Sequence, residues 1–157
     1  DPGTATTGYG FVNLSDKGNE VVKWGLIETD KGLLKEKRLE FIFEETVKLI
    51  NIHKPDVFVF EKVFFSNNAK TAIAVGQAQG VMLLAACKTG VRVEEYAPGT
   101  NKKMITGNGR ANKKEVQMHI RKILGSRVKS EKHKKTHFDD AADALAIALP
   151  THLKLVR

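Results

Sequence analysis

Four acidic side chains stand at positions from which they could act together on a phosphodiester bond: Asp1, Glu61, Asp140 and Asp143. Glu61 directly follows the wholly apolar run 57–60, which is typical of a central strand covered on both faces. In open α/β sheets, crevices and ligands are found at the carboxyl ends of strands. A partly desolvated carboxylate there favours a cationic partner. An ordinary strand-end acid paired with Lys62 is the alternative interpretation.

Asp140 and Asp143 lie three residues apart at the start of a helix expected over 138–149. Residues at this spacing share a helix face, with Cβ atoms about 5–6 Å apart, and acids in a first turn gain from the helix dipole. Asp139 points elsewhere and could cap the helix. In the alternative, Asp139 and Asp140 are both capping residues and Asp143 is a first-turn acid. That alternative leaves Asp143 facing an apolar helix without a cationic partner.

Carboxylates gathered from distant parts of a chain suit phosphodiester hydrolysis with two divalent metal ions. Hard oxygen ligands suit Mg²⁺ or Mn²⁺, and two ions about 3.5–4 Å apart activate water and stabilise the leaving oxygen. Asp1 and Glu61, at the ends of adjacent expected strands, would then meet Asp140 and Asp143. No Cys/His spacing indicates zinc. His137 could move a proton or bind metal, but an exposed histidine ahead of the helix is the favoured interpretation.

Positive charge is concentrated in one part of the chain. The sequence has 26 Lys and Arg against 18 Asp and Glu, a net charge of +8, and residues 98–135 alone carry more than this whole excess. Such a concentration is expected of a polyanion binder, although a solvated surface without function gives the same pattern. A membrane surface is disfavoured, because the basic residues do not lie opposite a broad apolar helical face.

Strands and helices are predicted to alternate after an initial hairpin, which indicates an α/β fold with a mixed sheet in a single domain over 1–157. The hairpin strands are 7–14 and 20–28, and further strands are expected at 57–60 and 91–96. Helices are expected at 34–53, 68–88, 113–124 and 138–149. Residues 1–3 look like the end of a strand, so we expect apolar residues ahead of Asp1.

Two further features bear on the class of protein. Cys87 is the single cysteine and is flanked by alanines, which favours a small buried core residue and a reducing cytosol. The sequence has no run of about 18 apolar residues, so no membrane-spanning segment is expected.

Six short motifs follow one another through nearly the whole chain. They are DPGTATTGYG at 1–10, EKVFF at 61–65, VGQAQG at 75–80, EYAPGT at 95–100, TGNGRA at 106–111 and DAADALA at 140–146. In this order they closely resemble the motifs of the RuvC family of Holliday-junction resolvases. A lone Asp-Pro-Gly would be weak, but the ordered set is very specific.

The resemblance implies an RNase H-like fold, with a mixed five-stranded sheet flanked by helices, in a cytoplasmic, nucleoid-associated homodimer. It implies paired symmetric nicking of four-way DNA junctions, alongside the RuvA-RuvB branch-migration complex. Two Mg²⁺ ions per active site, with Mn²⁺ as a substitute, would bind to the positions matching Asp1, Glu61, Asp140 and Asp143. An RNase H-fold nuclease acting on RNA or a hybrid, and a non-catalytic junction binder, are the other functions considered.

The resemblance also suggests DNA contacts. Phe64 would stack on a base near the junction centre, although a core phenylalanine beside Phe65 is the alternative. Lys102 and Lys113 match basic positions near the scissile phosphate, and Arg110 is a further candidate for a backbone contact. Residues 126–136 are more basic than the family pattern leads us to expect.

Overall fold

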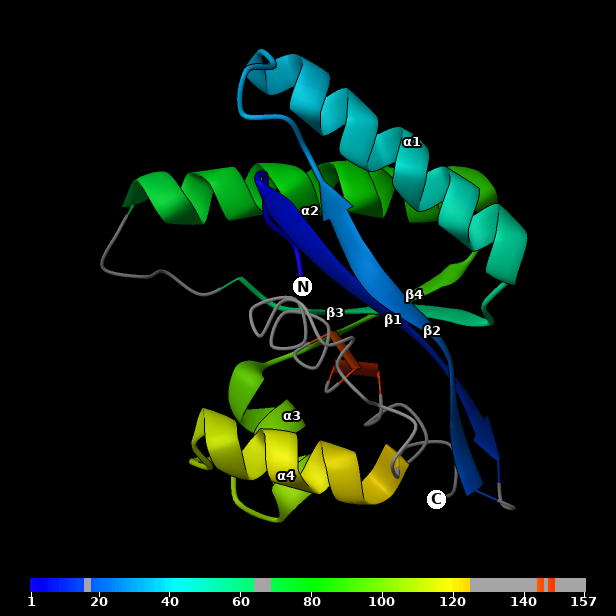
Figure 1. Ribbon diagram of the computed structural model, residues 1–157, viewed down its shortest axis with the longest axis vertical. Helices are drawn as coiled ribbons and strands as arrows, with labels where there is room; N and C mark the ends of the chain where they lie inside the picture. The colour runs from blue at the N-terminus through cyan, green and yellow to red at the C-terminus, as the bar shows by residue number, and fades with distance from the viewer. Residues whose placement is uncertain (16–17, 64–68, 125–143, 146, 149–157) are drawn as a thin grey trace.

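The computed structural model describes residues 1–15, 18–63, 69–124, 144–145 and 147–148, and Figure 1 shows their arrangement. The elements in chain order are β1 (Thr6–Ser15), β2 (Gly18–Glu28), α1 (Lys35–His53), β3 (Val57–Glu61), α2 (Ala69–Thr89), β4 (Arg92–Tyr96), α3 (Pro98–Thr106) and α4 (Lys113–Leu124). Residues 144–145 and 147–148 are also helical. None of the helices in the described part of the chain is long and apolar enough to cross a membrane.

The strands form two hydrogen-bonded pairs. β1 and β2 make the predicted antiparallel hairpin, with Gly10 opposite Trp24 and an irregularity between Phe11 and Val12. β3 and β4 pair in parallel, with Glu61 opposite Tyr96. Within the described residues these are two separate two-stranded sheets. The mixed α/β character is therefore confirmed, whereas the five-stranded sheet stays a prediction.

The predicted helices are present within a residue or two where the structure describes them, and one element was missed. The predicted helix over 138–149 is seen only at the four helical residues near its end. The missed element is α3, which begins with Pro98 directly after β4. It ends at Gly107, whose φ of 79° is left-handed, and the Gly107 N–H donates to the Lys103 carbonyl oxygen. Proline at the start and glycine just past the end are typical helix boundaries.

Each face of the hairpin packs on its own hydrophobic core. On one face, Ile27 joins Ile42 of α1 and Met82 of α2. On the other, Trp24 packs against the core of α3, α4 and the fully buried Leu145. Alternate strand residues point to opposite faces, so one hairpin serves both cores. In Figure 1, α1 and α2 accordingly lie on one side of the strands and α3 and α4 on the other.

The expectation that Cys87 is a buried core residue was wrong. The cysteine is exposed, because the helical period turns its neighbours Ala85 and Ala86 toward the core instead. The alanine-rich composition of α2 therefore marks one packed face and not a helix buried all round.

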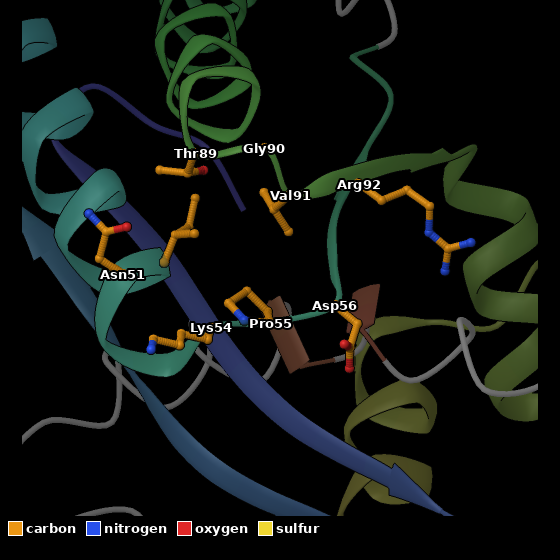
Figure 2. A pocket seen from close by; sticks show the side chains of 9 residues that line it. Asn51, Lys54, Pro55, Asp56, Thr89, Gly90, Val91 and Arg92 are labelled. Atoms are coloured by element: carbon orange, nitrogen blue, oxygen red, sulfur yellow. The ribbon is translucent and has the colours of Figure 1, made fainter.

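A pocket of about 420 Å³ lies at the amino ends of β3 and β4, at the opposite end of β3 from Glu61. Figure 2 shows its lining residues, which include Asn51 and Lys54 at the end of α1 and Val91 just before β4. Lys54 stands in the left-handed conformation, with φ 45° and ψ 56°, and its N–H donates to the Ile50 carbonyl oxygen over 2.8 Å.

Replacing Lys54 by glycine should stabilise the protein. A residue with a Cβ pays roughly 1–2 kcal/mol in the left-handed region, and glycine loses only part of this gain through the greater freedom of its unfolded chain. We expect the free energy of unfolding to rise by about 0.5–1 kcal/mol, measured by urea denaturation. The control, Lys54→Ala, removes the same charge but keeps the Cβ. Equal stability of the two variants would show that the backbone conformation is not what limits this position.

Candidate active site

Glu61 ends β3 with a half-buried side chain, as the sequence predicted. The parallel pairing continues past it, because the Lys62 N–H donates to the Tyr96 carbonyl oxygen over 2.9 Å. From α3, the amide Nδ2 of Asn101 donates to Glu61 Oε1 over 3.4 Å. The carboxylate is therefore held between the strand end and the helix that follows the neighbouring strand.

Asp1 is paired with β1 through its backbone. Its nitrogen donates to the Gly8 carbonyl oxygen, and the Gly8 N–H donates to the Asp1 carbonyl oxygen, both over 3.0 Å. Two antiparallel residues that face each other in a hydrogen-bonded pair exchange bonds in this way. Residues 1–3 are not themselves part of a strand, since β1 begins at Thr6. The Asp1 residue itself is exposed.

The buried Thr7 stabilises the turn between Asp1 and β1 by hydrogen bonds to the turn's backbone. This fully buried side chain donates to the Gly3 carbonyl oxygen over 2.8 Å and accepts from the Gly3 N–H over 3.3 Å. A Cβ at Gly3 would lie 2.4 Å from the Thr6 carbonyl oxygen, so only glycine fits there. The turn thus has little freedom to move Asp1.

Two residues that the sequence did not single out fasten the same turn to the rest of the fold. Arg38 of α1 donates through Nη2 to the Thr4 carbonyl oxygen over 2.7 Å and through Nε to Thr29 Oγ1 over 2.8 Å. Thr29, after β2, donates through Oγ1 to the same Thr4 oxygen over 2.6 Å. A charge-assisted arginine fork is a strong tether. In the sequence, one arginine on the amphipathic helix α1 does not indicate a contact with the turn after Asp1.

The turn of helix that follows the two predicted aspartates packs under β1. Leu145 is fully buried, and a Cβ added at Gly10 would lie 2.5 Å from Leu145 Cδ2. Asp140 and Asp143 themselves lie outside the described residues, as do Phe64, His137 and the basic stretch 126–136. Their predicted roles remain predictions.

The predicted DNA-binding cations lie on α3, on α4 and in the loop that joins them. Lys102 is half-buried and directly follows Asn101, while Arg110 and Lys113 are exposed. Asn112 and Glu115 cap the start of α4 reciprocally: the Glu115 N–H donates to Asn112 Oδ1 over 3.0 Å, and the Asn112 N–H donates to Glu115 Oε2 over 2.9 Å. The capping fixes the helix end that presents Lys113.

The donors that the structure describes fit a hard divalent cation. Glu61 offers a carboxylate whose Oε1 is already hydrogen-bonded by an amide, and oxygen ligands of this kind suit Mg²⁺ or Mn²⁺. No group of three His, Cys, Asp or Glu that could hold a metal ion is found among the described residues, which include Asp1 and Glu61 but neither of the other two predicted ligands. The contacts given above tie Glu61 to α3 and Asp1 to β1.

Glu61 stands at the carboxyl end of a strand, where α/β proteins bind ligands, and it contacts α3, which packs against the lysine-bearing α4. This arrangement suits an enzyme that acts on a phosphate backbone. The family model of crossover junction endodeoxyribonuclease RuvC matches residues 1–152. The protein of that name from Caldicellulosiruptor saccharolyticus is 42% identical over 151 residues, which cover 95% of this chain and 87% of the relative. The chain belongs to the RuvC family of crossover junction endodeoxyribonucleases.

Solved structures agree with this assignment. The structure of Thermus thermophilus RuvC superposes with a TM-score of 0.84 at 30% identity, over 99% of this chain and 93% of that one. The same Thermus protein in complex with a Holliday junction substrate also gives a TM-score of 0.84, at 29% identity, over 98% of this chain and 93% of that one. The RuvC-type, RNase H-like fold that the motifs predicted is therefore confirmed.

Proposed function

We propose that the protein is a structure-selective endodeoxyribonuclease that resolves Holliday junctions by paired symmetric nicks in recombination and repair. The observation that carries the proposal is the position of Glu61, half-buried at the end of β3 and bonded by α3, a helix that carries Lys102 and packs against the lysine-bearing α4. A non-catalytic junction binder would gain nothing from a carboxylate placed beside a phosphate-binding surface. The relatives' printed name, a crossover junction endodeoxyribonuclease, supports the same reaction.

Asp1, Glu61, Asp140 and Asp143 are proposed to hold two Mg²⁺ ions, for which Mn²⁺ can substitute. Ions bound there activate a water molecule and stabilise the leaving 3′-oxygen. The protein's own contribution is to fix the ligands: Thr7 and Arg38 hold the turn after Asp1.

Lys102, Lys113 and Arg110 are proposed to bind the DNA backbone near the site, with Phe64 stacking on a base at the junction centre. Symmetric nicks need two copies of the site, so we propose a homodimer, acting in the cytoplasm with the RuvA-RuvB branch-migration complex. The finer fold that we propose is one domain over 1–157 with a five-stranded RNase H-like sheet.

The function is tested with end-labelled four-way junctions, matched duplexes and RNA–DNA hybrids, each incubated with and without Mg²⁺. We expect Mg²⁺-dependent cleavage of the junction at symmetric positions and intact duplex and hybrid. Cleavage of the hybrid in preference to the junction would favour a ribonuclease instead. Binding of the junction without any cleavage, in Mg²⁺ or in Mn²⁺, would favour a pure binding protein.

Replacing Lys102 and Lys113 together by alanine should weaken junction binding and make it less dependent on salt. Each lysine that neutralises a phosphate releases about 0.9 of a counterion, so losing two should reduce the slope of log K against log salt by about 1–2. Titrations at several salt concentrations measure the slope. The control pair, Lys37→Ala with Lys48→Ala, removes two exposed lysines from α1. A slope that stays at the parent's value would refute the assignment.

A further inference from the structure

Asn101 is a polar residue in a place that suits an apolar one. Its side chain is only 3% exposed, and it lies on α3 between the strand end and the buried Ile105. Its Nδ2 donates to Glu61 Oε1, while its Oδ1 is buried and has no hydrogen-bond partner among the described residues. The opposite amide orientation would place two oxygens together, so the donor must face Glu61.

The energetics of this position favour a functional explanation. A buried amide oxygen without a partner costs about 1–3 kcal/mol, and asparagine is also a weaker helix former than leucine. A leucine, which has the same number of side-chain heavy atoms, would avoid both costs and could pack with the core of α3 and α4. The side-chain bond from Asn101 to Glu61 is long for an N–H···O bond at 3.4 Å. It therefore adds little stability, but it sets the direction in which the carboxylate faces.

We infer that Asn101 is a positioning residue for the metal-binding carboxylate of Glu61, an inference that rests on the proposed function. The amide donates to Oε1, so it biases the orientation that the carboxylate presents to a cation. The length of the bond lets the carboxylate adjust when the cation binds. Partners of metal ligands that orient them in this way typically change metal affinity by about 10- to 100-fold when removed.

The test compares Asn101→Leu with the parent in two measurements, the affinity for Mn²⁺ and the Tm without metal. A purely structural role of Asn101 would lower both. Calorimetric titration with Mn²⁺, in the absence of DNA, should show affinity lowered about 10-fold or more. Thermal unfolding without metal should show an unchanged or raised Tm, because the orphaned amide oxygen is gone. The matched control is Thr46→Val, which removes a polar group from an equally buried position on α1, where Oγ1 donates to the Ile42 carbonyl oxygen of the same helix. It should leave Mn²⁺ affinity unchanged.

A second variant, Asn101→Asp, keeps the size of the side chain and replaces the donor with another carboxylate. Repulsion from Glu61 should lower the Tm without metal, and added Mn²⁺ should restore it to at least the value of the parent in metal. A fall in Tm that Mn²⁺ does not restore would overturn the inference. So would an Asn101→Leu protein that binds Mn²⁺ as tightly as the parent.

Failure of the proposed function is distinguishable from failure of this inference. A parent protein that neither binds Mn²⁺ nor cuts a four-way junction overturns the function, and the role of Asn101 with it. A parent that does both, beside an Asn101→Leu variant of equal metal affinity, overturns the role of Asn101 alone.

Discussion

Replacing Glu61 by glutamine should abolish metal-dependent cleavage of a four-way junction while junction binding survives. Glutamine keeps the shape of the side chain and can still accept from Asn101, but it brings no negative charge to a cation. We expect single-turnover cleavage to fall by about 10³-fold or more, a loss of roughly 4 kcal/mol of transition-state stabilisation. Binding, measured by gel shift without metal, should stay equal or tighten slightly, because one charge that repels phosphate is removed.

The control for Glu61→Gln is an acid at the other end of the same strand. Asp56 is exposed and directly precedes β3, beside the pocket of Figure 2. Asp56→Asn makes the same chemical change and should leave cleavage at the parent rate. Parent-level cleavage by Glu61→Gln, or an equal loss in both variants, would rule out a specific role for Glu61.

Gly10→Ala should destabilise the protein and impair cleavage further than the lost stability explains. The new Cβ would lie 2.5 Å from Leu145 Cδ2 and 2.9 Å from Cγ, closer than real contacts allow. Leu145 is fully buried and cannot swing into solvent. Overpacking of this kind costs about 1–3 kcal/mol. Because Asp143 stands two residues before Leu145, a shift of that turn should also disturb the proposed metal site.

Urea unfolding and cleavage under conditions where both proteins stay folded measure the two effects of Gly10→Ala. Gly76→Ala is the control, since a Cβ there meets no atom of the described residues within 4 Å. Alanine in α2 should raise stability by up to about 1 kcal/mol. The double variant Gly10→Ala with Leu145→Ala should lose less stability than the sum of the two single losses, and this coupling measures the contact. Additive effects would show that Gly10 and Leu145 do not interact.

Much of the fold was predictable because its elements carry local signals. The apolar run before Glu61 predicted β3, and helical periodicity predicted α1 and α4. The helix α3 was missed because Pro98, Gly99 and Thr100 are poor helix formers and the segment is short. Its boundary residues, Pro98 and Gly107, were the available signal. Tertiary burial of Ile105 in the core of α3 and α4 stabilises what the local propensities do not.

The candidate site was predictable at its acids but not at the residues that hold them. Glu61 stands at a strand end that the sequence itself marks. By contrast, Arg38 reaches Thr4 across 34 residues, and Asn101 reaches Glu61 across 40. Such contacts depend on how the elements pack, which no local pattern contains. The motifs identified the family, but they gave no separate signal for these anchors.

Asp1 and Glu61, two acids of the proposed site, are held in place by helices from opposite layers of the molecule. The turn after Asp1 is hydrogen-bonded by Arg38 of α1, whereas Glu61 is hydrogen-bonded by Asn101 of α3. The helices α1 and α3 pack on opposite faces of the hairpin. The distance between Asp1 and Glu61 therefore depends on how tightly the two helical layers pack against each other. If both acids hold metal as proposed, metal binding would connect the two helical layers, and it should reduce the motions of α1 and α3 together.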